Sequence, residues 1–300
     1  MSGLNYLIGI LFALFAGIVA YIGVLIQKHV INKHSNNPKF IRSLVKSPLW
    51  IFGLLLQIIV GGLVFYFIAI IFIGPALVPG LMTAGLIILA IGSVKILKEK
   101  LGKEEIFGIM LMIAGVTFLG LSELSIDVFT FNILDYGFIF RIIVFTIVII
   151  CSAIMLEILH RKYTKNKGLL FAIEAGLILS LNTIWASPGT TIVTHLIEGI
   201  IIEEEIFFGI IIGILLLIIT CIGITLGQIS FKYGQANVLA PLTNVPIQII
   251  PLIAFFIIFL STPSSVISVI YMICGFALII SSSFMLSKRQ AKFESTENEK

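Results

Sequence analysis

The sequence predicts an all-α polytopic membrane protein with nine transmembrane helices, arranged as two inverted four-helix repeats plus one linker helix. Of the 300 residues, 59% are hydrophobic and 11% are charged, whereas soluble domains carry about 25% charged residues. Nine stretches are apolar and long enough to cross roughly 30 Å of hydrocarbon, and segments of the first half recur in the second. A water-soluble enzyme is excluded, because too few polar side chains remain to cover a globule of this size.

The predicted spans begin near the N-terminus and follow one another closely. Each needs about 20 mostly apolar residues. The apolar stretch 49–97 is too long for one helix, and Gly74 and Pro75 divide it at a tight turn. The first span has no basic segment before it and no small-residue cleavage site after it, so we expect a span and not a cleaved signal. The nine spans are 4–26, 49–73, 75–97, 105–121, 136–157, 168–187, 206–230, 238–260 and 264–286.

The lysine and arginine residues fall almost entirely on one side of these spans. If the N-terminus is outside, all 19 of them except Arg141 lie on the inner side. Cytoplasmic loops of membrane proteins carry an excess of Lys and Arg. We therefore expect a multi-pass protein of the cell membrane with an outer N-terminus and a cytoplasmic C-terminus. Its basic loops are expected to face anionic membrane lipid, not nucleic acid.

The two longer outer loops carry acids and no Lys or Arg. These acids are either an ordinary solvated surface or an electrostatic funnel that concentrates cations at the mouth of a pathway. Between 190 and 205, apolar residues recur at helical spacing, which predicts an amphipathic helix lying on the outer membrane surface. The acids of the two loops are Glu123, Asp127, Asp135, Glu198, Glu203, Glu204 and Glu205.

An internal repeat relates the two halves of the chain. Residues 9–18, GILFALFAGI, and 168–177, GLLFAIEAGL, share six identical positions; 111–115 resembles 271–275, and 74–79 resembles 236–241. The offsets are nearly constant, which predicts two four-span units separated by the fifth span. Because five spans separate equivalent starting points, the second unit enters the membrane from the opposite side. We expect repeats at 1–121 and 168–287, a linker at 122–167 and a short tail at 288–300.

Several motifs resemble the drug/metabolite transporter (EamA-like) superfamily, which is built from such inverted units. Ser230–Leu242, SFKYGQANVLAPL, resembles that superfamily's segment A-L-x-Y-x-x-A-x-x-V-x-P-L, and Leu97–Leu101, LKEKL, is similar to its L-x-E-[KR]-L. The nine-span layout, the basic loop between spans one and two, and Gly74–Pro79, GPALVP, resemble the NIPA-type magnesium transporters. The resemblance implies a transporter, not an enzyme, with magnesium or another divalent cation as the favoured solute.

Glu174 is the only acid well inside a predicted span, about 9 Å from the inner end of span six at 1.5 Å per residue. A carboxylate in lipid is costly, so such residues usually face a cavity or a partner and mark ion or proton pathways. The equivalent residue of the first repeat is Phe15, so the charge is not needed to build the unit. The plainer alternative is a carboxylate that reaches the inner interface or pairs with a lysine. Ala172–Gly176 also resembles the first helix of small multidrug resistance proteins, which carries their coupling carboxylate.

Further polar residues lie inside the predicted spans. An Asn or Gln in a span most often makes a hydrogen bond between helices, worth roughly 1 kcal/mol. Several of them at the depth of a carboxylate favour a cavity, and we expect Glu174 to share one with Asn244 and Gln248. The other candidate substrate-binding residues are Gln57, Thr83 and Asn182.

Proline interrupts the two spans that are equivalent in the repeat, spans three and eight. Each interior proline removes a backbone N–H and frees a carbonyl. Paired interruptions of this kind indicate the binding site of a transporter. We expect helix breaks at the site at Pro79, Pro241 and Pro246.

The sequence lacks the motifs that metalloproteolysis and nucleotide hydrolysis require. The 4 histidines are predicted to lie in loops, and neither HExxH nor GxxxxGK[ST] occurs. We therefore expect no cofactor, and a secondary transporter or facilitator of a small solute, with a divalent cation favoured. Two alternatives remain open: a proton-coupled exporter or exchanger of a metabolite or organic cation, and a non-transporting membrane scaffold or lipid-modifying enzyme. The sequence also leaves open a homodimer.

Overall fold

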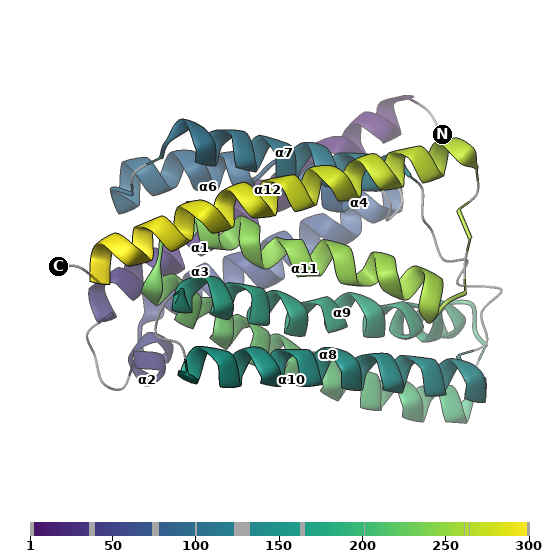
Figure 1. Cartoon of the computed structure of the whole chain (residues 1–300). Helices are drawn as coiled ribbons and strands as arrows, with labels where there is room; N and C mark the ends of the chain where they lie inside the picture. The colour runs from purple at the N-terminus through teal and green to yellow at the C-terminus, as the bar shows by residue number, and fades with distance from the viewer. Residues whose placement is uncertain are drawn as a thin grey trace.

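The protein is a bundle of helices. The regular elements of the computed structural model are all helical, and the two chain termini lie at opposite ends of the bundle (Figure 1). The end that carries Lys33 and Lys288 is called the basic end below, and the end that carries Glu203 and Glu204 the acidic end. The structure describes residues 3–35, 40–73, 78–99, 101–122, 133–162, 166–200, 202–260, 262–263 and 265–298.

Within these ranges, seven helices are long and apolar enough to cross a membrane. They correspond to predicted spans one and four to nine, and each long apolar run has formed a helix as expected. Their bounds are α1 (Gly3–His34), α7 (Lys103–Leu121), α8 (Tyr136–Lys162), α9 (Lys167–Ile197), α10 (Glu203–Tyr233), α11 (Ala236–Ile257) and α12 (Val266–Asn298).

Shorter apolar helices, Pro48–Gly62 and Leu81–Leu97, lie where spans two and three were predicted. Span three is divided at Ala84 and Gly85, whose N–H groups donate to carbonyls three residues back. The elements here are α3 (Pro48–Leu55), the π-helical segment η1 (Leu56–Phe65), α4 (Tyr66–Ile73), α5 (Val78–Thr83), α6 (Leu86–Gly92) and the π-helical segment η2 (Ser93–Leu97). The short helix α2 (Phe40–Val45) precedes them. Gly74 and Pro75, the predicted turn, lie outside the described residues.

The amphipathic surface helix predicted within 190–205 is wrong. α9 continues through Pro188 as far as Ile197, and α10 begins at Glu203. Ile192 is buried and would contact a Cβ placed at Gly209 of α10, whereas Val193 and Leu196 are exposed on the same helix. Apolar residues at helical spacing are common to a surface helix and to the end of a packed span, so the pattern alone did not distinguish the two.

α1 and α9 each pack closely against another helix at a glycine. α1 packs against α5, and a Cβ added at Gly17 would collide with the carbonyl oxygen of Met82. α9 packs against α11, and a Cβ added at Gly176 would collide with the carbonyl oxygen of Thr243. Small residues permit such close backbone contact between helices in lipid, where van der Waals packing replaces the hydrophobic effect as the source of helix association.

α7 and α12 cross each other at a second pair of glycines. A Cβ added at Gly115 would lie 2.9 Å from the carbonyl oxygen of Gly275, and one added at Gly275 would lie 2.8 Å from that of Gly115. Polar contacts fix the crossing on both sides, because Ser282 donates to the carbonyl of Gly108 (2.6 Å) and Ser268 donates to that of Ser122.

Two of the three buried clusters hold most of the bundle together; the third is small and comprises Ala13, Ala69 and Val78. The larger joins the two halves and includes Leu86, Met112, Leu239 and Ile279. The second packs α8 against the helices of the second half; its residues include Ile142, Leu181, Ile212 and Ile258. The linker helix is therefore bound to the second half.

Candidate functional site

Glu174 lies on α9, about 10 Å from the first residue of that helix at 1.5 Å per residue. Its side chain is 5% exposed, so it faces protein and not lipid. The carboxylate of Glu157, on α8, is close enough to interact with it electrostatically. Glu157 is half-buried and lies about 8 Å before the end of α8 on the same measure. The two carboxylates are thus at a similar depth on neighbouring helices.

The predicted cavity shared by Glu174, Asn244 and Gln248 does not match this arrangement. Gly176 is pressed against Thr243 of α11. At 3.6 residues per turn, a residue two positions earlier points about 200° away. Glu174 is therefore turned toward α8, whereas Asn244 and Gln248 are on α11. The direction of a side chain around its helix depends on packing, which the sequence pattern did not indicate.

Asn244 instead joins the two halves of the molecule. Its Nδ2 donates to the hydroxyl of Tyr21 on α1, at 2.8 Å. Gln248, one turn further along α11, is half-buried. The amide and the phenol thus link α11 to α1 near the middle of both helices.

Gln57 belongs to a chain of amides near the basic end. Gln27 of α1 donates to Gln57 in η1 (2.7 Å) and accepts from Gln228 of α10 (2.6 Å). Trp50 of α3 donates its indole N–H to Gln228, at 3.1 Å. Gln27 and Gln228 were not among the predicted site residues, although both lie at or near the inner ends of predicted spans, where their polarity was a usable signal.

Asn182 and Thr83 lie apart from these groups. Asn182 of α9 donates to the hydroxyl of Thr220 on α10, at 2.9 Å, which is the ordinary helix–helix role of an Asn in a span. Thr83 is buried at the end of α5.

The predicted helix breaks at proline are not formed. α11 runs without interruption through Pro241 and Pro246, which are both buried in it. Pro79 is the second residue of α5, where no intrahelical N–H bond is required. The ring of Pro246 packs on Gly176, 2.9 Å from the position of an added Cβ. The prolines therefore shape the contact between α11 and α9 and do not open a gap.

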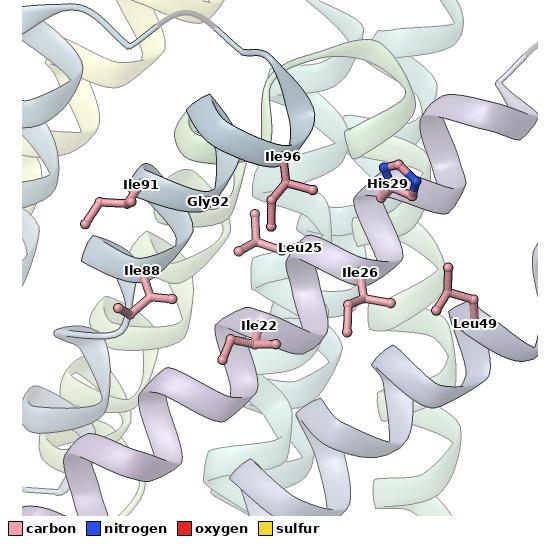
Figure 2. Close-up of a pocket in the computed structure, with 9 residues that line it drawn as sticks. All are labelled: Ile22, Leu25, Ile26, His29, Leu49, Ile88, Ile91, Gly92 and Ile96. Carbon is pink, nitrogen blue, oxygen red and sulfur yellow. The ribbon is translucent and has the colours of Figure 1, made fainter.

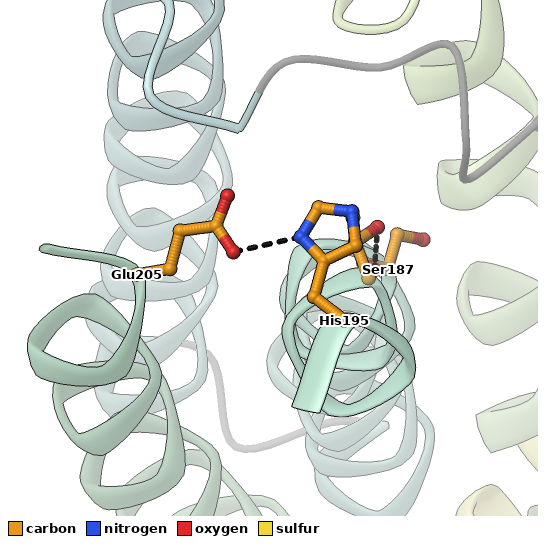
Figure 3. Close-up of polar contacts among 4 residues, drawn as sticks. Ser187, His195 and Glu205 are labelled. Carbon is orange, nitrogen blue, oxygen red and sulfur yellow. Dashed lines mark hydrogen bonds and ion pairs between the residues drawn. The ribbon is translucent and has the colours of Figure 1, made fainter. Parts of the chain in front are cut away.

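The acids of the acidic end differ in their surroundings. Glu203 and Glu204 are exposed in the first turn of α10. Glu205 is buried, and its Oε2 lies 2.8 Å from Nδ1 of His195 at the end of α9 (Figure 3). Asp135 accepts from the N–H of Phe138 (2.8 Å) and so caps α8. Glu205 and Asp135 are thus structural, and Glu123 and Asp127 lie outside the described residues.

A groove of about 320 Å³ lies between α1, α3 and α6 (Figure 2). Its lining is almost wholly apolar, with His29 as the one strongly polar side chain. It is therefore an apolar groove and not the polar cavity expected from the sequence. The lining residues are Ile22, Leu25, Ile26, His29, Leu49, Ile88, Ile91, Gly92 and Ile96.

The described residues contain no group of three or more His, Cys, Asp or Glu side chains that could hold a metal ion. What they contain is a pair of intramembrane carboxylates, amide bridges between two halves, and many long apolar helices. This combination is that of a multi-pass membrane protein with polar groups between its helices. The chain belongs to the magnesium transporter NIPA family, whose model matches residues 4–292. This is a family of transporters and not of enzymes. No curated protein and no solved structure matches the chain significantly.

Proposed function

We propose that the protein carries Mg²⁺ across the cell membrane and that Glu174 and Glu157 bind the ion during its passage. The observation that carries this is the pairing of a buried carboxylate with a second one at the same depth on the adjacent helix. Two neighbouring carboxylates repel each other, and a divalent cation between them relieves the repulsion. Mg²⁺ keeps several of its waters and is usually bound through one or two carboxylates. The pair therefore suits a partly hydrated ion in transit.

We expect transport by alternating access, in which the pathway opens first to one side of the membrane and then to the other. The parts that move against each other are two inverted repeats, spans one to four and six to nine. Two sets of contacts support this. Gly17 with Met82 and Gly176 with Thr243 are the same type of contact, and their positions differ by nearly the offset of the sequence repeat. Gly115 and Gly275 face each other reciprocally, as expected at an axis that exchanges the repeats. Such repeats rock against each other around a site near the midplane. Both repeats lie in one chain, so the pathway is complete in a monomer, and a homodimer would contain two.

The remaining site residues are assigned to the path between the halves. Asn244 and Gln248 on α11, with Gln57 in η1, supply amide oxygens that can replace water around the ion once the halves separate. Thr83 and Asn182 lie nearer the acidic end. Glu203 and Glu204 are exposed there, where negative charge raises the local concentration of cations.

The transported ion can be tested in liposomes. Purified protein reconstituted with an Mg²⁺-sensitive dye inside should give Mg²⁺ uptake well above that of protein-free vesicles. A membrane potential and a pH gradient are imposed separately, so that a dependence on the pH gradient alone would favour the proton-coupled alternative. Absence of Mg²⁺ uptake in vesicles that contain folded protein would contradict the proposal.

We also propose that the basic end is cytoplasmic, with the N-terminus outside. The basis is the distribution of Lys and Arg along the sequence, in which all except Arg141 fall on the inner side of the predicted spans. A cysteine introduced at exposed Glu204 should react with an impermeant thiol reagent added outside cells, whereas one at exposed Lys95 should react only after permeabilisation. The reverse pattern would overturn the orientation.

A further inference from the structure

Lys28 of α1 reaches across the bundle to the end of α10. Its side chain is 5% exposed. The ammonium group donates to the backbone carbonyls of Phe231 and Gly234, the latter at 2.7 Å. A cation at the C-terminus of a helix complements the helix dipole and satisfies carbonyls that lack intrahelical partners. Lys28 therefore caps α10 from the opposite half of the molecule.

Glu99 acts in the same way on the next helix. It follows η2, and its carboxylate accepts from the N–H groups of Ala236 (2.9 Å) and Asn237 (3.4 Å) in the first turn of α11. Burial raises the pKa of Glu99, while these N–H groups and the charge of Lys28 act to lower it. An anion at a helix N-terminus is favourable for the same electrostatic reason as a cation at a C-terminus.

The turn between α10 and α11 is thus held from both sides by charges of the first half. The amide contacts of Gln27 and Trp50 with Gln228 of α10 lie at the same end. All these contacts must lengthen if the two halves separate at the basic end. We propose that Lys28 and Glu99 form a latch that keeps the pathway closed at the basic end, and that each transport cycle has to open it.

The two latch residues belong to the first repeat, and the equivalent positions of the second repeat are uncharged. At the offset of 159 that relates Gly17 to Gly176, Lys28 corresponds to Ser187. At offsets of 160 to 162, Glu99 corresponds to residues 259–261, Phe-Leu-Ser. Neither charged residue has a charged counterpart in the other repeat, so no equivalent contacts stabilise closure at the acidic end. The resting protein therefore favours the state that is closed at the basic end. This inference rests on the alternating movement proposed above.

Thiol labelling in nanodiscs tests the latch without any transport measurement. Ser230, which is fully buried just before the turn, is replaced by cysteine in a background with Cys151, Cys221 and Cys274 changed to alanine. The reporter should react slowly with a water-soluble maleimide. Lys28→Met and Glu99→Gln should each raise the labelling rate about tenfold or more, because each removes charge-assisted hydrogen bonds that only the closed state makes.

The matched controls are Lys95→Met and Glu104→Gln, both exposed residues near the same end, which should leave the rate unchanged. If Lys28→Met does not yield folded protein, Glu99→Gln decides alone. Labelling of the Glu99→Gln reporter at the parental rate would overturn the latch. Mg²⁺ uptake by the parent protein is measured separately, so a wrong cargo and a wrong latch give different results.

Discussion

Glu174→Gln should reduce Mg²⁺ uptake about tenfold or more, since each roughly 1.4 kcal/mol of lost stabilisation of the bound ion is a factor of ten. The substitution preserves the shape of the side chain and removes its charge. Glu174 is buried against protein, so the loss cannot be made up by solvent. Uptake should also lose most of its dependence on pH, because the variant has no proton to exchange for the ion. The measurement is initial uptake into dye-loaded liposomes from mildly acidic to mildly alkaline pH.

The control for this variant is Glu104→Gln, an exposed glutamate at the start of α7 that should transport like the parent. Glu157→Gln should reduce Mg²⁺ uptake less than Glu174→Gln does, because Glu157 is only half-buried. The double variant should lose less than the sum of the two free-energy changes if both carboxylates bind one ion. If Glu174→Gln transports normally across this pH range, the residue is structural and the ion passes elsewhere.

The sequence predicted the helices well, because long apolar runs leave little choice in lipid. All backbone N–H and C=O groups must be paired there, so each run becomes a helix. The ends of the runs were less certain: α9 passes through Pro188, where the apolar pattern continues into the packed end of the helix. Span two includes ten residues of π-helix, Leu56–Phe65, which no periodicity of the sequence indicated.

The direction of the candidate side chains could not be predicted from the sequence. Glu174 is buried, and the carboxylate that interacts with it is that of Glu157, which was predicted to be the last residue of span five. Asn244 donates a hydrogen bond to Tyr21 and not to Glu174. The contact between Gly176 and Thr243 fixes the rotation of α9 and α11 about their own axes. Such rotations depend on which small residues meet, and that information is spread over distant parts of the chain.

The burial of Lys28 is a second feature that could not be predicted from the sequence. By composition it was one more basic residue of the inner loops, where positive charge faces lipid headgroups and water. In the structure it is buried and binds the carbonyls of Phe231 and Gly234. The motifs that carried the family resemblance also prove to be in contact, since Glu99 of LKEKL binds the start of α11 within SFKYGQANVLAPL. Resemblance identified both segments, and only the fold brought them together.

Gly176→Val should destabilise the protein by about 3 kcal/mol or more, at the upper end of what overpacking costs. The added side chain would meet the backbone carbonyl of Thr243 and the ring of Pro246, neither of which can move without displacing α11. Gly17→Val should have a similar effect, since its added side chain would meet the backbone carbonyl of Met82. Gly213→Val on α10 is the control, because nothing lies within 4 Å of its added Cβ. The readout is the apparent Tm in detergent, with a fall on the order of 10 °C for the first two variants and little change for the third. Equal stability of Gly176→Val and Gly213→Val would mean that α9 and α11 do not pack as closely as the structure has them.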